Sequence, residues 1–397
     1  MERKTDIAII GAGPYGLSIA AHLAAKGADF RIFGTPMGVW RDNMPDGMFL
    51  KSEGFASDLF DPKGELTLER YCRANGHIYA HIGVPVSREL FCEYGVAFQQ
   101  RFVPDLNASH VTDVHPAADG FILRLENGET VQAGRVIVAV GISHYAYVPP
   151  ELAKLPAKVM RHSSQQQALT NYAGQTVAVI GAGSSAVDMA GLLHQAGAST
   201  KLLTRRAKIW FHHPPVKLGG LKRVTSKITR PRSGLGFGWR SRLACDMPII
   251  FHHMPSRFRI RVTRGHLGPS ASWMTRQLVE DKVDVRLEMT LRDATVRDGQ
   301  PVLTFEKTDG QVEEVVVDHV VAGTGYKVDI ERLAFLDEAI RKSIAQEQRT
   351  PVLTRNFESS VPGLYFVGVS AANSFGPLLR FAWGARFTAR RLAAHLA

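Results

Sequence analysis

Two glycine-rich segments place small residues and free backbone amides where phosphate binding needs them. The segments are GAGPYG at residues 11–16 and GAGSSA at residues 181–186. In such a turn the first glycine permits a tight bend, the second lets the backbone approach a pyrophosphate, and the third position needs a small residue for helix packing. Amides at the start of the following helix then point at the phosphates. The residues predicted to bind phosphate are Gly11, Gly13, Pro14, Tyr15 and Gly16 in the first segment and Gly181, Gly183, Ser184, Ser185 and Ala186 in the second.

Each segment lies between a short apolar run and an alanine-rich amphipathic stretch, the strand–turn–helix context that such a motif requires. Two such units in 397 residues predict an α/β fold with two Rossmann-like dinucleotide-binding domains. We expect an FAD-binding domain made of residues 1–150 and 320–397. An NADPH-binding domain of residues 151–319 is inserted into it and carries a basic cap insert at 207–270. This arrangement is typical of enzymes that pass hydride from nicotinamide to flavin.

The first unit departs from the usual pattern after its second strand. A carboxylate normally follows the glycines by about 20 residues and binds the ribose hydroxyls. Phe33, Gly34 and Thr35 occupy that place here. We therefore expect Thr35, backbone groups or water to bind the ribose. FAD is assigned to this unit because two-dinucleotide flavoproteins usually begin with the flavin site.

The second unit carries arginines at the corresponding place. Thr204, Arg205 and Arg206 follow its second predicted strand, where NAD-binding sites have an acid. A guanidinium there forms bidentate, charge-assisted bonds with a 2′-phosphate. The pattern favours NADPH as the nucleotide bound by the second unit. The alternative is that these are ordinary surface arginines.

The C-terminal quarter repeats features of the flavin unit. VVAGTGY at 320–326, with Gly325, resembles the strand and turn near the end of many FAD and NAD(P) oxidoreductases, and PGLYFVG at 362–368, with Gly368, resembles the last strand of their flavin domain. A helix is expected to begin just after Gly376, at Pro377 and Leu378, with its N-terminus toward the flavin. Asn373 and Ser374 precede it and are candidates to hydrogen-bond flavin or nicotinamide. The alternative is a helix that only closes the domain.

Net charge is +11, and the excess is local. Between residues 205 and 264 there are fifteen basic residues and one acid, Asp246. Proline, glycine and aromatic residues alternate with arginine in the insert at 207–270, which predicts an irregular cap with short helices. Three interpretations of this insert are open: a lid over the substrate entrance, a contact with a membrane surface or a partner, and a solvated structural insert. Nucleic acid is not expected as a partner, because no recognised binding motif accompanies the charge.

The cysteines, histidines and apolar runs of the chain narrow the class of protein further. Cys72, Cys92 and Cys245 are widely spaced and form no CxxC, which argues against a dithiol mechanism and for a cytoplasmic protein. The pairs at 212–213 and 252–253 are the only adjacent histidines, and they lack carboxylate or cysteine partners at ligand spacing, so no metal is predicted. The sequence also predicts no transmembrane segment. It leaves peripheral membrane contact and homo-oligomerisation open.

With these motifs in place, the chain resembles the class B flavoprotein monooxygenases, which include flavin-containing and amine N-hydroxylating enzymes. The resemblance covers most of the chain and is built from dispersed matches. They are GVWRDNMPDGM at 38–48, VAVGISHYAYVP at 138–149, RHSSQ at 161–165 and, loosely, LKSEGFASDLFDPKGELTLERY at 50–71. Two features depart from the family. Lys158 replaces the glycine of the FxGxxxH pattern before His162, and LKSEG stands where an active-site asparagine is expected.

The resemblance implies an FAD- and NADPH-dependent monooxygenase that uses O₂ and a flavin C4a-hydroperoxide on a small polar substrate, most often by N-hydroxylation. It further implies that Lys51 and Ser52 lie beside the flavin ring as donors, with Asn373 as a third catalytic candidate. Trp40 would form a wall of the flavin pocket, and His162 and Ser163 would lie near the nicotinamide. An NADPH-dependent FAD oxidoreductase without oxygen insertion is the alternative. A nucleotide-sensing binding protein with a basic docking insert is the second.

Overall fold

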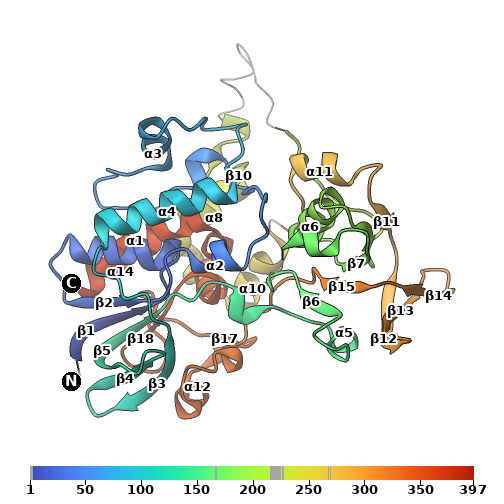
Figure 1. Cartoon of the computed structure of the whole chain (residues 1–397). Helices are drawn as coiled ribbons and strands as arrows, with labels where there is room; N and C mark the ends of the chain where they lie inside the picture. Colours follow the sequence, from blue (N-terminus) through green and yellow to red (C-terminus); the bar gives the residue numbers. More distant parts are fainter. Residues whose placement is uncertain (1–2, 166–167, 215–224, 226–227, 267, 269) are drawn as a thin grey trace.

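The computed structural model describes residues 3–165, 168–214, 225, 228–266, 268 and 270–397. It contains two α/β units side by side (Figure 1). The first unit, on the left of the view, combines the N-terminal third of the chain with its C-terminal end. The second unit, on the right, is built from the middle of the chain. The predicted fold class, two Rossmann-like units with one inserted into the other, is confirmed.

The first unit is built on a six-stranded sheet. Its strands run in the order β2 (Phe30–Phe33), β1 (Arg3–Ile10), β5 (Thr130–Val138), β4 (Gly120–Leu125) and β3 (Val111–Ala117), and β18 (Leu364–Phe366) also pairs with β5. Strands β2, β1, β5 and β18 are parallel, so their carboxyl ends meet at one edge. The β1 run is apolar and Ile7, Ala8 and Ile9 are fully buried, as expected for a parallel strand covered on both faces.

The helices of the first unit come from both ends of the chain. They are α1 (Pro14–Ala24), α2 (Gly38–Asp42), α3 (Leu68–Ala74), α4 (Arg88–Phe102), α12 (Glu338–Ser343), α13 (Ala372–Phe375) and α14 (Ala385–Leu396). A short hairpin, β16 (Gln346–Glu347) and β17 (Thr350–Pro351), precedes the final strand. Helix α1 packs against α14, so the first and last helices of the unit share one core.

The second unit has a five-stranded, fully parallel sheet. Its order is β11 (Asp284–Arg286), β8 (Ser199–Leu203), β7 (Thr176–Ile180), β15 (His319–Ala322) and β6 (Met160–His162). Its helices are α5 (Pro150–Ala153), α6 (Ser184–Gln195) and α11 (Trp273–Val279). An antiparallel sheet of β12 (Thr290–Arg297), β13 (Gln300–Glu306) and β14 (Val312–Val316) extends from it. Because β15 pairs with β7 and β6, residues 320–322 belong to this sheet rather than to the first unit, in which we expected them.

The two chain segments that connect the units run antiparallel to each other. The Tyr147 amide donates to the Gly325 carbonyl at 2.9 Å, and the Lys327 amide donates to the Tyr145 carbonyl at 2.8 Å. The Tyr145 hydroxyl reaches Ser370 Oγ at 2.8 Å. These bonds tie both crossings to the segment that follows β18.

The insert belongs to the second unit by sequence but packs on the first. Its described elements are β9 (Arg232–Ser233), β10 (Gly236–Phe237), α8 (Trp239–Asp246), α9 (Pro248–His252) and α10 (Ser256–Gly265). Leu235, Ala244 and Cys245 are members of the first unit's hydrophobic core. Thr263 Oγ1 donates to the Ala372 carbonyl at 3.2 Å. The insert therefore fastens the second unit to the C-terminal segment of the first.

The final helix begins later than the sequence suggested. Residues Pro377–Arg380 form a single 3-10 turn, Phe381 is extended, and α14 starts only at Ala385. The Tyr15 hydroxyl lies 3.1 Å from the Leu379 carbonyl and 2.8 Å from the Phe381 carbonyl. The Phe381 carbonyl also accepts from the Gly384 amide at 3.0 Å, within the short turn that precedes α14. The prediction of a helix that starts just after Gly376 is therefore wrong.

Candidate functional site

The first glycine-rich turn has three glycines with different environments. Gly11 adopts φ +111°, and a Cβ there would lie 2.4 Å from the Ala139 carbonyl oxygen. A Cβ on Gly16 would lie 1.9 Å from the Gly11 carbonyl oxygen, so α1 packs directly on the turn. A Cβ on Gly13 would meet nothing within 4 Å. The backbone at Gly13 therefore faces open space, as required of the glycine that approaches a pyrophosphate.

The start of α1 lacks a protein partner for its amides. Gly13 is the N-cap, no side chain caps the helix, and Pro14 occupies the first turn. Helix α6 starts in the same way, with Gly183 as N-cap and no side-chain cap before Ser184 and Ser185. Both helices are longer than two turns, so their dipoles add to the attraction of an anion. These two starts fit the phosphates of two dinucleotides.

The residues around the first turn come from the carboxyl edge of the sheet. Gly34, at φ +114°, lies close to Gly11. Thr35 Oγ1 lies 3.2 Å from His110 Nε2. His110, just before β3, is a polar neighbour that the sequence did not indicate, because 75 residues separate it from Thr35. Together they place a hydroxyl and an imidazole where an acid is usually found.

Tyr15, Gly368 and Trp40 are placed mainly by packing. Gly368 adopts φ +67°, a conformation that favours glycine, and a Cβ there would lie at an ordinary contact distance of 3.7 Å from the Tyr15 ring. Trp40 meets Phe91 edge to face at 4.8 Å and packs on the first unit's core. The role of Trp40 as a wall of the flavin pocket stays a prediction.

The second turn repeats the close packing of the first. Gly181 adopts φ +145°, and a Cβ there would lie 2.3 Å from the Gly323 carbonyl oxygen. Ala186 is fully buried, and a Cβ on Gly323 would lie 2.6 Å from the Ala186 Cβ. The small residues after β7 and β15 thus let α6 rest on the edge of the sheet.

Thr204, Arg205 and Arg206 follow β8 at this same edge. Thr204 is buried, and its Oγ1 accepts from the Arg206 amide at 3.2 Å. Arg205 and Arg206 are exposed, and within the described part of the chain neither forms an ion pair. Two unpaired guanidinium groups beside an uncapped helix start suit a 2′-phosphate.

His162 is held by the protein, whereas Ser163 is not. His162 Nδ1 lies 2.8 Å from Ser164 Oγ, and Nε2 lies 3.1 Å from the Gly325 carbonyl. Burial lowers the pKa of His162, so the ring is neutral near pH 7. Among the described residues, the buried Ser163 hydroxyl has no hydrogen-bond partner. Ser163 is thus the better candidate to contact a bound cofactor.

Lys51 lies where both units and the insert meet. Its Nζ donates to the Ser270 carbonyl, and a Cβ on Gly47, in the same loop, would lie 3.5 Å from the Leu192 side chain of α6. Although the side chain reaches solvent, the surrounding protein desolvates it and lowers its pKa to about 8, against the attraction of Asp188. Ser52 is occupied within its own loop, since its Oγ lies 2.8 Å from Ser57 Oγ.

Asp188 is a candidate that the sequence did not suggest. It lies on α6, is buried, and accepts from Thr275 Oγ1 at 2.6 Å. Burial raises its pKa. The attraction between Asp188 and Lys51 acts against this shift and links α6 to the loop of the first unit that carries Lys51. Only the tertiary structure brings these two residues together.

The C-terminal candidates are mostly committed to structure. Asn373 Nδ2 donates to Thr350 Oγ1 at 3.0 Å, and the Ser374 carbonyl accepts from Arg259 at 3.3 Å. Gly376, at φ +94°, packs against the Phe251 ring of the insert, and Pro377 and Leu378 are buried. These contacts anchor the insert, and they leave the catalytic role predicted for Asn373 without direct support.

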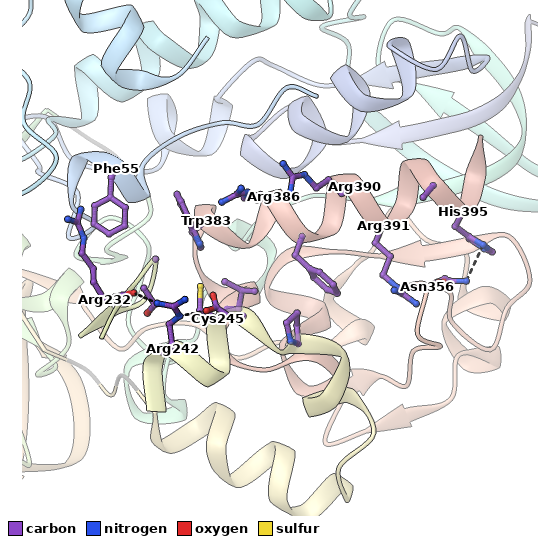
Figure 2. A pocket seen from close by; sticks show the side chains of 17 residues that line it. Phe55, Arg232, Arg242, Cys245, Asn356, Trp383, Arg386, Arg390, Arg391 and His395 are labelled. Carbon is purple, nitrogen blue, oxygen red and sulfur yellow. Dashed lines mark hydrogen bonds and ion pairs between the residues drawn. The ribbon is translucent and has the colours of Figure 1, made fainter. Parts of the chain in front are cut away.

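A groove of about 860 Å³ lies between the insert and α14 (Figure 2). Its lining includes five arginines, which are Arg232, Arg242, Arg386, Arg390 and Arg391. At one end Arg232 lies over the Phe55 ring at 3.6 Å, and at the other Asn356 Nδ2 lies 3.1 Å from His395 Nδ1. The lining includes no residue of either glycine-rich turn, although it includes Leu378 from the segment predicted to face the flavin.

Asp58, in the loop before α3, gives a testable pH dependence. Burial raises the pKa of its carboxyl from 3.8 to about 7. The folded chain therefore retains a proton that the unfolded chain releases near pH 4, so the stability from this group falls as pH rises from 4 to 7. We expect Asp58→Asn to raise Tm by several degrees at pH 8 and to leave it unchanged at pH 4. Thermal melts at both pH values test this, and an equal shift at both would contradict it.

The fold and the two turns define a class of protein, the two-dinucleotide oxidoreductases. The family model for pyridine nucleotide-disulphide oxidoreductases matches residues 5–217. The chain belongs to this family, which confirms the predicted enzyme class.

Relatives and solved structures agree with that class. FAD-dependent oxidoreductase domain-containing protein 2 of Mus musculus is 23% identical over an alignment 400 residues long that covers 92% of this chain and 53% of that protein. Ferredoxin–NADP reductase 1 of Cupriavidus pinatubonensis is 29% identical over 214 residues, 51% of each chain. The chain thus spans about half the length of the curated relatives it matches. The ornithine N-hydroxylase of Kutzneria sp. 744, solved with reduced FAD, NADP⁺ and L-ornithine, has a TM-score of 0.77 at 15% identity and covers 99% of both chains. The fold is therefore that of the flavin monooxygenases, as the resemblance implied.

The three cysteines are buried and free, and burial raises the pKa of the Cys92 thiol to about 11. Within the described ranges, no cluster of three metal-ligating side chains occurs. No helix of the described chain is long and apolar enough to cross a bilayer. Lys217, Lys222, Arg223 and Lys227 of the basic insert lie outside the described residues.

Proposed function

We propose that this chain is an FAD- and NADPH-dependent monooxygenase that hydroxylates the nitrogen of a small polar amine. FAD would bind at the start of α1, with Gly13 beneath its pyrophosphate and Thr35 and His110 toward its ribose. NADPH would bind at the start of α6, with its 2′-phosphate on Arg205 and Arg206. The observation that supports this most directly is the pair of uncapped helix starts, one in each unit.

The protein's own groups position the reactants rather than perform the redox chemistry. When bound, FAD supplies the transfer of electrons from NADPH to O₂. The unpartnered Ser163 hydroxyl would orient the cofactor at the second site. Lys51, held between the two units, would donate a hydrogen bond near the reacting atoms and contribute to the exclusion of water.

The lid role of the insert also remains part of this proposal. The insert packs on the segment after β18 and reaches the loop that carries Phe55. It therefore covers one side of the junction where Lys51 lies.

An NADPH-dependent FAD oxidoreductase without oxygen insertion is the second candidate. The match to a ferredoxin–NADP reductase favours it. A dithiol mechanism does not fit this chain, because its three cysteines are isolated and unpaired. A nucleotide-sensing binding protein would bind both cofactors without turnover.

One set of measurements separates these functions. The protein is loaded with FAD and mixed with NADPH without oxygen; loss of the oxidised flavin absorbance indicates an enzyme, and its absence indicates a binding protein. Amines, amino acids and thioethers are then supplied with ¹⁸O₂. Incorporation of ¹⁸O into a product supports the monooxygenase. If NADPH is oxidised but no substrate yields a product that contains ¹⁸O, the second candidate is supported.

Lys51 gives a sharper prediction for the same reaction. We expect Lys51→Met to lower product formed per NADPH oxidised at least fivefold, while anaerobic flavin reduction changes little. Because the pKa of Lys51 is about 8, coupling in the parent protein should fall above pH 8, where the ammonium loses its proton. Lys63→Met, at an exposed lysine paired with Glu65, is the control. Unchanged coupling in Lys51→Met would remove Lys51 from the site.

A further inference from the structure

The insert exposes an unusual number of large apolar side chains. Sixteen such residues are exposed in the described chain, and nine lie in the insert. They are Trp210, Ile228, Phe237, Trp239, Leu243, Met247, Ile250, Met254 and Phe258. Single exposed apolar residues are normal, but a concentration of them marks an interaction surface.

Six of these residues lie on α8, α9 and α10 or in the short links between them, and their side chains are exposed. Ala244, Cys245 and Phe251 are buried, and α8 to α10 pack on the C-terminal segment around α13. On α8, Trp239 and Leu243 are four residues apart and therefore share one side of the helix. The outward residues Trp239, Leu243, Met247, Ile250, Met254 and Phe258 form what we call the insert face; each is between 37% and 55% exposed.

Arginines without carboxylate partners border the insert face. Residues 228–266 contain eight arginines and one acid, Asp246. Within this stretch the sole ion pair joins Arg242 to Asp246. Arg240, Arg257 and Arg261 are exposed and unpaired within the described residues. The positive charge is therefore available to an external anion.

We propose that the insert face docks on the surface of an anionic lipid bilayer. Tryptophan, phenylalanine and leucine beside arginine are the composition of helices that lie in the membrane interface. Arginine contributes by attraction to acidic headgroups, while the apolar side chains enter the boundary of the acyl region.

A second copy of the chain is a poorer occupant. A twofold interface would place the same arginines of both copies against each other, and like charges at an interface oppose association. A soluble acidic protein would satisfy the arginines, but it would also have to cover six apolar side chains. A lipid surface meets both requirements at once.

Vesicle co-sedimentation of the FAD-loaded full chain tests the proposal. Vesicles of phosphatidylcholine with 30% phosphatidylglycerol should bind the protein at 50 mM NaCl. Binding should fall at least tenfold at 500 mM NaCl and with phosphatidylcholine alone, because salt screens the charges. Two triple variants should each lose at least tenfold in affinity for these vesicles. One carries Leu243→Ser, Ile250→Ser and Phe258→Ser, and the other carries Arg240→Gln, Arg257→Gln and Arg261→Gln.

The control is the double variant Val312→Ser, Val316→Ser, at two exposed positions on β14. It should bind vesicles like the parent protein, and all variants should keep their flavin content and Tm, because the altered side chains are exposed. Absence of binding to anionic vesicles at low salt would overturn the proposal, as would binding that neither triple variant weakens. Conversion of a dimer to a monomer by the serine variant, without vesicle binding, would assign the insert face to a second copy.

Discussion

Replacement of Gly13 by valine is expected to leave the chain folded and to weaken FAD binding at least a hundredfold, about 2.7 kcal/mol. Gly13 has φ −85° and ψ −171°, which any residue can adopt, and the space above its Cα is open. A valine side chain would fill the volume that the pyrophosphate needs. Flavin absorbance after purification and titration of the apoprotein with FAD measure the loss, and circular dichroism and Tm report the fold.

The matched control is Gly16→Ala, one turn further along α1. A Cβ there would lie 1.9 Å from the Gly11 carbonyl oxygen, which is backbone and cannot move aside cheaply. We expect this variant to lose stability as well as flavin. If Gly13→Val retained a full complement of FAD, the first turn would not be the pyrophosphate site.

The second large effect is expected at the end of β8. Arg205→Ala should raise KM for NADPH about a hundredfold and KM for NADH less than threefold, because only NADPH has a phosphate for this guanidinium. Arg205 forms no ion pair among the described residues, so its loss should leave the fold intact. Steady-state kinetics with both nucleotides test this.

Arg206→Ala shows how the two arginines share the phosphate, and Arg297→Ala, at an exposed arginine paired with Glu314, is the control. Equal increases in KM for NADPH and NADH after Arg205→Ala would refute the assignment to the 2′-phosphate. If only Arg206→Ala raised KM for NADPH, the contact with the 2′-phosphate would be assigned to Arg206 instead of Arg205.

The glycine turns could be predicted from sequence because their constraints are local. Gly11, Gly16 and Gly181 are required by contacts within a few residues or with the adjacent strand end. The two α/β units followed from the two repeated strand–turn–helix segments. Hydrophobic periodicity and glycine spacing carry this information directly.

The details that the sequence missed depend on contacts between distant segments. The segment before α14 contacts the Tyr15 hydroxyl, which is more than 360 residues away in sequence from the carbonyls that it contacts. The proximity of Lys51 to Asp188 and of Thr35 to His110 likewise exists only in three dimensions. Pairing of β15 with β7 shifted a domain boundary, because a strand alone does not indicate which sheet it joins.

The seating of Leu235, Ala244 and Cys245 in the first unit's core has a mechanical consequence. The two halves are joined by the paired crossings at Tyr147 and Gly325 and also by the insert, whose Thr263 contacts Ala372 in the segment after β18. Rotation of one half against the other would draw Leu235, Ala244 and Cys245 out of the core and expose apolar surface to water. We therefore expect exchange of one nucleotide for another to proceed through local shifts of loops, while the two halves keep their mutual orientation.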